Sequence, residues 1–278
     1  MKSVLRSVAT LGLGLACALS SSTLFADTAA EVYKKALPSV LLLKVKTPTG
    51  GGSGTAFVVS ADGWVVTNHH VIEGATQALA IGENGEEFEV AGILADGDMV
   101  NDIAVLQLRG PKVPPPLPLG ESADVQPGDD VRVVGCPLGY SPSLTEGKLS
   151  ARRKSGANLE GAREDYSAWE LQISADISPG NSGSPVFTST GDVIGVAVGT
   201  RVDAQGMHFA IPIERAKDML AKLAPNTAVM PFAGSGGAAL ARNLGISGGV
   251  ILAVAAAYFL SRRVASQKER AKLRARKN

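Results

Sequence analysis

The stretch Ser178-Pro179-Gly180-Asn181-Ser182-Gly183-Ser184-Pro185-Val186 decides the fold of this chain. Two matching stretches precede it, Thr67-Asn68-His69-His70-Val71 and Asn101-Asp102-Ile103-Ala104-Val105. A histidine, then an aspartate, then a serine, each beside a short apolar run, is the chain order of one of the three well-known Ser-His-Asp arrangements. The three stretches therefore predict one catalytic site built from distant segments.

The residue types suit that chemistry. A serine hydroxyl is a poor nucleophile and needs a base within hydrogen-bond reach to take its proton. An imidazole accepts that proton and returns it to the leaving amine, while a buried carboxylate fixes the imidazole tautomer. We expect the backbone N–H groups of Gly180, Asn181 and Ser182 to converge on the developing oxyanion, since small residues let the backbone come that close.

The three stretches resemble the HtrA/Deg branch of the trypsin-like serine proteases, which have the chymotrypsin fold. Three further stretches carry the resemblance, at residues 52–59, 134–139 and 209–212. In the family pattern T-N-x-H-V the final histidine is catalytic. The resemblance therefore implies His70 as the base, Asp102 as its partner and Ser182 as the nucleophile.

The same resemblance implies an all-β fold of two six-stranded β-barrels with short flanking helices. The barrels are expected at about residues 39–110 and 117–212 of a protease domain spanning 27–224, with the site in the crevice between them. The sequence itself predicts helices at 28–38 and 213–223. It predicts strands at 40–45, 55–59, 63–67, 87–94, 103–108, 130–134, 144–151, 169–173, 185–187, 193–198 and 208–211, and a charged loop at 152–165.

Several assignments have alternatives that the residues leave open. Ser182 is alternatively a plain turn serine in a Gly-rich stretch. Asp102 alternatively caps a turn after Asn101, although the apolar residues after it favour the start of a buried strand. His69 is expected to be a structural or exposed neighbour of the base.

Asp176 and His208 are candidates for the specificity pocket. Asp176 precedes Ser182 by six residues, a count at which some chymotrypsin-fold enzymes place a carboxylate that selects Lys or Arg. The HtrA branch instead prefers small or aliphatic side chains at the cleavage position, and a counted offset does not fix pocket geometry. His208 is alternatively a strand residue without a role in binding.

No cofactor or metal is predicted. Three histidines and one mature cysteine cannot build a metal site at the usual ligand spacings. Cys17 would leave with an N-terminal leader, so Cys136 stands alone and an intrachain disulfide is excluded.

Both ends of the chain have the patterns of targeting or membrane segments. Lys2 and Arg6, an apolar run at 8–19 and a small residue at Ala26 predict a signal peptide over 1–26. An uncleaved anchor is the alternative, and a lipoprotein at Cys17 is disfavoured because Gly14 stands where leucine is wanted. Residues 244–261 carry no charge over 18 positions and predict a transmembrane helix, the alternative being a buried amphipathic helix.

Charge is distributed unevenly along the chain. The tail at 262–278 has eight Lys or Arg against one Glu, which by the positive-inside rule keeps it cytoplasmic, and it is expected to rest on anionic lipid headgroups. Taking the tail's +7 and the leader's +2 from the total of +1 leaves −8 for residues 27–261. An acidic catalytic domain gives no support for nucleic-acid binding.

The Gly/Ala-rich segment at 225–243 is typical of a flexible tether rather than a PDZ domain. We therefore expect a membrane-tethered, extracytoplasmic or periplasmic serine endopeptidase that cleaves unfolded or damaged envelope proteins. Homotrimers are common in the family, but no residues for trimer contacts can be picked out. A rival hypothesis is a latent domain that binds proteins without cutting them. An esterase is disfavoured by the missing G-x-S-x-G motif and by the His-Asp-Ser order.

Overall fold

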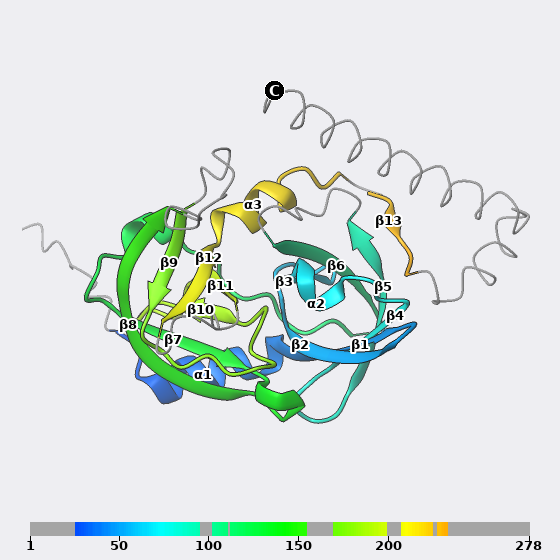
Figure 1. Cartoon of the computed structure of the whole chain (residues 1–278), viewed down its shortest axis with the longest axis horizontal. Coiled ribbons are helices and arrows are strands. Elements are labelled where there is room, and N and C mark those ends of the chain that lie inside the picture. Colours follow the sequence, from blue (N-terminus) through cyan, green and yellow to red (C-terminus); the bar gives the residue numbers. More distant parts are fainter. Residues whose placement is uncertain are drawn as a thin grey trace, which may run out of the picture.

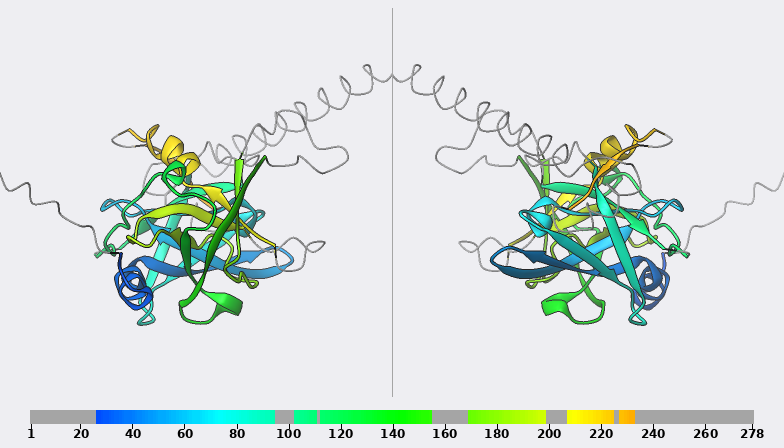
Figure 2. Two further views of the ribbon diagram at one scale, coloured as in Figure 1. Left: turned by 90° about the vertical axis from the view of Figure 1, so that its left-hand side faces the viewer. Right: turned by 90° about the vertical axis from the view of Figure 1, so that its right-hand side faces the viewer.

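The computed structural model describes residues 26–94, 102–110, 112–154, 169–198, 207–224 and 227–232. Their strands form two β-barrels, which lie on opposite sides of Figure 1. Figure 2 turns this pair so that each end faces the viewer in turn. The expected all-β architecture of two six-stranded barrels with few, short helices is confirmed.

Barrel one is closed by the pairing of β5 with β6, which joins the two ends of the order β5-β4-β1-β2-β3-β6. A β-bulge between Val90 and Gly92 lies in this closing pair, and bulges supply the bend that closure needs. Its interior holds one apolar cluster to which every strand of the barrel contributes. The strands are β1 (Val40–Thr47), β2 (Gly50–Val58), β3 (Trp64–Asn68), β4 (Gln77–Ile81), β5 (Glu87–Leu94) and β6 (Ile103–Arg109).

Barrel two is closed in the order β10-β11-β12-β9-β8-β7 around its own apolar interior. A register shift between Leu149 and Ala151 bends the long strand β8 against β9. The strands are β7 (Asp130–Gly135), β8 (Ser143–Lys154), β9 (Trp169–Ile173), β10 (Pro185–Phe187), β11 (Val193–Val198) and β12 (His208–Pro212). Short 3-10 helices flank them at η2 (Ser122–Asp124) and η3 (Pro137–Gly139).

A third apolar cluster is shared by both barrels and explains why β1 is apolar without alternation. Leu41 and Leu43 belong to the interior of barrel one, whereas Val40 and Leu42 belong to the shared cluster. That cluster also contains Phe187 and other residues of barrel two. A strand that is buried on both faces appears in the sequence as a continuous apolar run.

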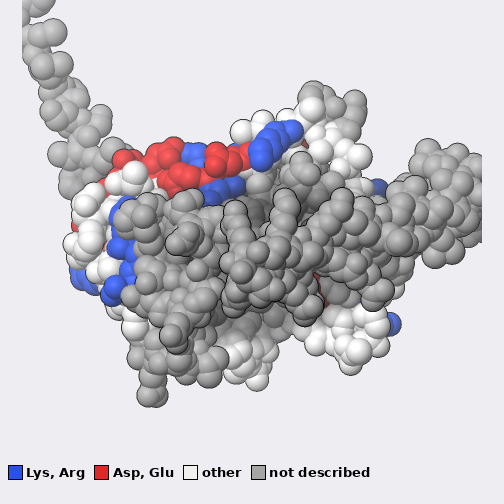
Figure 3. Space-filling model, turned by 45° about the horizontal axis from the view of Figure 1, so that its top comes forward, with Lys and Arg blue, Asp and Glu red and all other residues white. Residues whose placement is uncertain are grey.

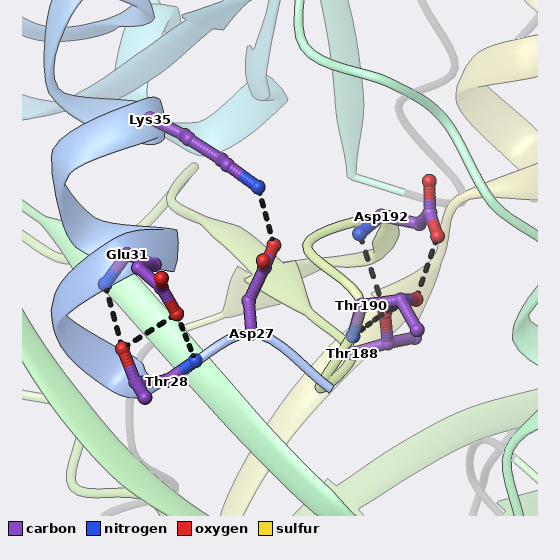
Figure 4. Close-up of polar contacts among 7 residues, drawn as sticks. All are labelled: Asp27, Thr28, Glu31, Lys35, Thr188, Thr190 and Asp192. Atoms are coloured by element: carbon purple, nitrogen blue, oxygen red, sulfur yellow. Dashed lines mark hydrogen bonds and ion pairs between the residues drawn. The ribbon is translucent and has the colours of Figure 1, made fainter. Parts of the chain in front are cut away.

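The helix α1 (Ala29–Ala36) lies against β7 and β8, below barrel two in Figure 1. Figure 4 shows a capping box at its start, in which Glu31 N–H donates to Thr28 Oγ1 at 3.3 Å and Thr28 N–H donates to Glu31 Oε2 at 2.7 Å. These bonds to Thr28 hold the pKa of Glu31 below its ordinary value. Asp27 N–H donates to Ser189 O at 2.8 Å, and the Asp27 carboxylate pairs with Lys35 at 2.7 Å. The helix is thereby fixed to the turn between β10 and β11.

The last described elements return to barrel one. The helix α3 (Glu214–Leu220) packs against β6 of barrel one and β12 of barrel two. The strand β13 (Val229–Met230) then pairs with β5 of barrel one. Phe232 is only 3% exposed and joins the interior cluster of barrel one.

The element boundaries differ from the prediction in several places. The strands β4 and β13 were not predicted, because short runs such as Gln77-Ala78-Leu79-Ala80-Ile81 are made largely of residues with weak strand preference. The strand β2 begins at Gly50, five residues before the expected start, since its glycines pair with β1. Both predicted helices are shorter than expected, because Leu37–Ser39 forms a 3-10 turn (η1) and α3 ends at Leu220.

The predicted leader up to residue 25, most of the tether and all of 244–278 lie outside the described residues, as does 155–168. Among the residues that are described, no helix has both the length and the apolar character to cross a membrane. In the face that Figure 3 shows, Asp and Glu form a band with Lys and Arg beside it. Lys148 pairs with Asp130 at 2.5 Å and holds the pKa of that carboxyl below its ordinary value.

Candidate active site

His70 lies at the start of the short helix α2 (His69–Ile72), which follows the fully buried strand β3. The carbonyl of Asp102, the residue before β6, holds the junction between β3 and α2 in place. It accepts from Asn68 Nδ2 at 3.0 Å and from His69 N–H at 3.1 Å. Asp102 itself has φ +53°, a left-handed conformation that few residues other than glycine adopt. Backbone of this kind tends to persist where a site requires it.

The Asp102 carboxylate binds His70 through both oxygens. Oδ1 accepts from the His70 backbone N–H at 2.8 Å, and Oδ2 lies 2.7 Å from His70 Nδ1. A carboxylate without a proton can only accept, so this contact requires the imidazole proton on Nδ1. The other ring nitrogen, Nε2, is then an acceptor on a side chain that is 46% exposed.

The serine loop, residues 178–183, is held by hydrogen bonds to its carbonyl groups. Pro179 O accepts from Leu138 N–H at 2.7 Å, and Gly180 O accepts from the Thr55 hydroxyl at 2.9 Å. Asn181 O accepts from the N–H at position 184 at 3.0 Å, and Ser182 O accepts from Thr55 N–H at 2.8 Å. Because a peptide unit is planar, fixing each carbonyl also fixes the N–H on the other side of that unit.

The three N–H groups of the serine loop that are expected to converge on the oxyanion differ in their hydrogen bonding. Asn181 N–H donates to Ser178 O at 3.0 Å and is used inside the turn. Within the described residues, the N–H groups of Gly180 and Ser182 donate to no acceptor. Two donors separated by one residue are thus left free beside the serine.

Two glycines of this loop are required by its geometry. Gly180 has φ +96°, and a Cβ there would come within 2.6 Å of Cys136 O and of Leu138 N. Gly183 has φ +88°, and a Cβ there would come within 2.1 Å of Thr55 O. Both positions therefore combine a left-handed backbone with close contact to neighbouring chain.

Ser182 is half-buried and lies at the junction of the barrels. Its carbonyl is bound by Thr55 of β2, and a Cβ on the adjacent Gly54 would lie between Ser182 O, at 3.1 Å, and the Val71 side chain, at 2.6 Å. Val71 follows His70, so the serine loop and α2 flank the same point of β2. Among the described residues, no hydrogen bond joins His70 to Ser182. Such bonds are often long before substrate binds.

The remaining predicted residues are also located. His69 is half-buried, and its Nδ1 has no hydrogen-bond partner within the described part of the chain. The two candidates for the specificity pocket meet, with His208 Nε2 3.5 Å from Asp176 Oδ1. The Asp176 side chain is 91% exposed, whereas that of His208 is 9% exposed. A carboxylate so open to water is not the floor of a closed pocket in this structure.

Two neighbours of the serine loop lie in stretches that carry the family resemblance, but the sequence analysis assigns neither of them a role in the site. Thr55 lies on β2 and Cys136 directly follows β7, and Cys136 N–H donates to the Thr55 hydroxyl at 3.0 Å. Burial raises the pKa of the Cys136 thiol to about 11, which leaves it a neutral packing group at neutral pH. In the described part of the chain, no group of three or more His, Cys, Asp or Glu side chains is arranged to hold a metal.

Known proteins are similar to this chain over the region that holds the candidate site. The family described as "Trypsin-like peptidase domain" matches residues 54–196, just over half of the chain. "Serine protease HTRA2, mitochondrial" of Bos taurus is 33% identical over 200 residues, which are 69% of this chain and 41% of that protein. "Probable periplasmic serine endoprotease DegP-like" of Halomonas elongata is 37% identical over 173 residues, 61% of this chain and 35% of that protein.

The chain thus spans less than half the length of these two relatives. A solved structure, "HtrA-type protease AlgWS227A with tripeptide", is similar with a TM-score of 0.61 at 28% identity. The match covers 70% of this chain and 62% of that one. The region at 54–196 contains the segments that carry His70, Asp102 and Ser182.

Proposed function

Because the chain belongs to the trypsin-like peptidase family, in its HtrA/Deg branch, we propose that it is a serine endopeptidase whose triad is Ser182, His70 and Asp102. Two observations together support this: the double contact of His70 with Asp102, and a serine loop with two free N–H groups.

The reaction proceeds through an acyl-enzyme. Ser182 Oγ attacks the carbonyl carbon of the scissile peptide bond while its proton passes to His70 Nε2. Collapse of the tetrahedral intermediate breaks the C–N bond, and the imidazolium returns the proton to the leaving amine. Water then attacks the ester, with its proton going to His70 and then to Ser182 Oγ as the acid product leaves. No cofactor takes part.

Asp102 serves this cycle by holding the ring rather than by taking a proton. Its contact with Nδ1 keeps Nε2 free to accept, and its charge stabilises the imidazolium. Its second contact, with the His70 backbone N–H, fixes the backbone from which the imidazole ring extends. Gly180 and Ser182 N–H would bind the oxyanion, and losing one such donor typically costs about 10²–10³ in turnover.

A fluorescent fluorophosphonate tests the proposal, because it reacts only with an activated serine. We expect labelling of the purified full-length protein and none of Ser182→Ala or His70→Ala. Ser189→Ala, which changes a serine in the turn between β10 and β11, is the matched control and should label normally. Labelling of Ser182→Ala would assign the activity to another residue.

A latent, protein-binding domain is the second candidate function, and one observation favours it. Within the described residues His70 and Ser182 share no hydrogen bond, as expected of a domain that holds a client without activating its serine. A folded protein that resists labelling, yet prevents aggregation of an unfolded client, would support this candidate.

The substrates proposed are unfolded or damaged proteins outside the cytoplasm. The relative named as periplasmic supports an extracytoplasmic, periplasmic address. A membrane tether is proposed from the charge-free residues 244–261 and from Arg262 and Arg263 after them. Resistance of the protein to alkaline carbonate extraction would support the tether, and light scattering would test the homotrimer that the family resemblance implies.

Selectivity for Lys or Arg at the cleavage site is a weaker proposal, since Asp176 is open to water. Kinetics of Asp176→Ala on paired Arg and Val peptides test it. An unchanged ratio of kcat/KM would leave the small or aliphatic preference as the proposal.

A further inference from the structure

Thr55 is the residue of barrel one that holds the serine loop of barrel two. It is fully buried on β2. Its N–H donates to Ser182 O at 2.8 Å, and its hydroxyl donates to Gly180 O at 2.9 Å. One residue therefore binds the Gly180–Asn181 and Ser182–Gly183 peptide units, which lie on either side of the Asn181–Ser182 unit.

The same residue joins two more segments of the site. Its hydroxyl accepts from Cys136 N–H at 3.0 Å, so the single proton and a lone pair of this hydroxyl are both used. Its carbonyl accepts from the Thr67 hydroxyl at 2.7 Å, on the strand that leads to His70. Thr55 is thus bonded to the strand before the base, to the serine loop and to the residue that follows β7.

The hydroxyl has a specific effect on the free donors. It fixes the carbonyl of the Gly180–Asn181 peptide unit, which lies between the unit that carries Gly180 N–H and the unit that carries Ser182 N–H. Gly180 lacks a side chain and has φ +96°, so hydrogen bonds rather than a side chain hold this unit, and the Thr55 hydroxyl shares that role with the bond from Asn181 N–H to Ser178 O. If the carbonyl were released, the unit between the two free donors would be held at its N–H alone, and the direction of the Gly180 and Ser182 N–H groups relative to each other would be less tightly fixed.

We propose that Thr55 is a positioning residue for the oxyanion site: its buried hydroxyl, supplied from barrel one, sets the direction of the Gly180 and Ser182 N–H groups. This inference rests on the proposed function. It also predicts that the site is complete only when the two barrels are packed together, because the residue that aligns the donors belongs to the other barrel.

Kinetics of hydroxyl-deleted variants of the purified full-length protein test the inference. Thr55→Val replaces the hydroxyl by a methyl group of similar size and leaves the backbone bond to Ser182 in place. We expect kcat on a fluorogenic peptide to fall about 10- to 100-fold, less than the 10²–10³ for outright loss of a donor, with KM nearly unchanged. The rate of fluorophosphonate labelling should fall with kcat, and Thr55→Ser should restore both.

Ser39→Ala is the matched control. Ser39 is a buried residue whose hydroxyl donates to Pro115 O at 2.6 Å, away from the serine loop. Its loss should lower thermal stability without changing kcat. An equal fall of kcat in Ser39→Ala, or a Thr55→Ser variant as slow as Thr55→Val, would overturn the positioning role.

Hydrogen exchange of the peptide 176–184 gives a readout that does not depend on activity. Faster exchange in Thr55→Val than in the wild type supports the inference even if the wild type proves unlabelled, in which case only the proposed function fails. Thr55→Ala is measured as well, because it removes the hydroxyl without placing a methyl group against Gly180 O. Wild-type exchange and wild-type kcat in either folded variant would refute the inference.

Discussion

The substitution Asp102→Asn should disable the site while leaving its shape intact. The carboxylate accepts two hydrogen bonds from His70, one from the backbone N–H at 2.8 Å and one at Nδ1 at 2.7 Å. An amide has one acceptor oxygen and one NH₂ group. The backbone N–H can only donate, so it takes the oxygen, and the NH₂ group then faces Nδ1. The ring proton must move to Nε2, which can no longer accept the proton of Ser182.

The size of the effect follows from the alternative arrangement. To restore the active tautomer, the amide must flip and turn its NH₂ group against the His70 backbone N–H. That flip loses the hydrogen bond between the backbone N–H and the neutral amide oxygen, about 0.5–1.5 kcal/mol, and leaves a donor unsatisfied, about 1–3 kcal/mol. Together these amount to about 1.5–4.5 kcal/mol, or roughly 10–10³ in kcat. Loss of the charge that stabilises the imidazolium adds to this cost, so the expected total fall is on the order of 10⁴.

Steady-state kinetics on a fluorogenic peptide measure this loss, with KM expected to change little. Asp62→Asn, an exposed position in the turn between β2 and β3, is the matched control and should retain wild-type kcat. Circular dichroism should show both variants folded. A folded Asp102→Asn with kcat within about tenfold of the wild type would refute the tautomer argument.

Three further predictions concern stability. Gly183→Ala should unfold far more easily in urea than Gly74→Ala, because its new Cβ would lie 2.1 Å from the backbone of Thr55 at a φ of +88°. At Gly74 φ is +68° but the space is open, so the cost is only about 1–2 kcal/mol, and equal costs would contradict the clash. Phe232→Ala should cost about 3–5 kcal/mol, whereas Met230→Ala, at 36% exposed, should cost much less; a neutral Phe232→Ala would show that the segment does not pack as described. Burial raises the pKa of Cys136 from 9.0 to about 11, so the thiol ionises at lower pH in the unfolded chain than in the folded one. Its contribution to the free energy of unfolding is complete below pH 9 and is lost as the pH rises to about 11, by at most about 3 kcal/mol. Cys136→Ala should remove that alkaline loss in urea titrations.

Local patterns in the sequence nominate the residues of the candidate site but say little about the geometry in which the fold holds them. The motifs around His70 and Ser182 are short, so residue type and chain order alone pick them out, and the two-barrel fold comes with the family resemblance. The left-handed backbone at Asp102 has no local signal, because aspartate adopts it only when its surroundings require it.

The contacts of Thr55 were beyond sequence reasoning for a different reason. Its hydroxyl partners lie 125 and 81 positions away in the chain. Thr55 lies in a stretch that carries the family resemblance, but a threonine in a strand is common because β-branched residues suit strands, so the stretch does not reveal what its hydroxyl binds. The exposure of Asp176 was likewise unpredictable, since its spacing from Ser182 says nothing about what covers it.

The short strand β13 determines how the domain would carry a mechanical load. The chain leaves α3, reaches barrel one, pairs with β5 and buries Phe232 before the described residues end. A pull on the C-terminal end would therefore act first on the Phe232 side chain and on the β13–β5 hydrogen bonds. Directed along the strand it would load those bonds together, whereas directed away from the sheet it would break them one at a time. Such a force is borne first by barrel one, and the bonds from Thr55 are its route to the serine loop.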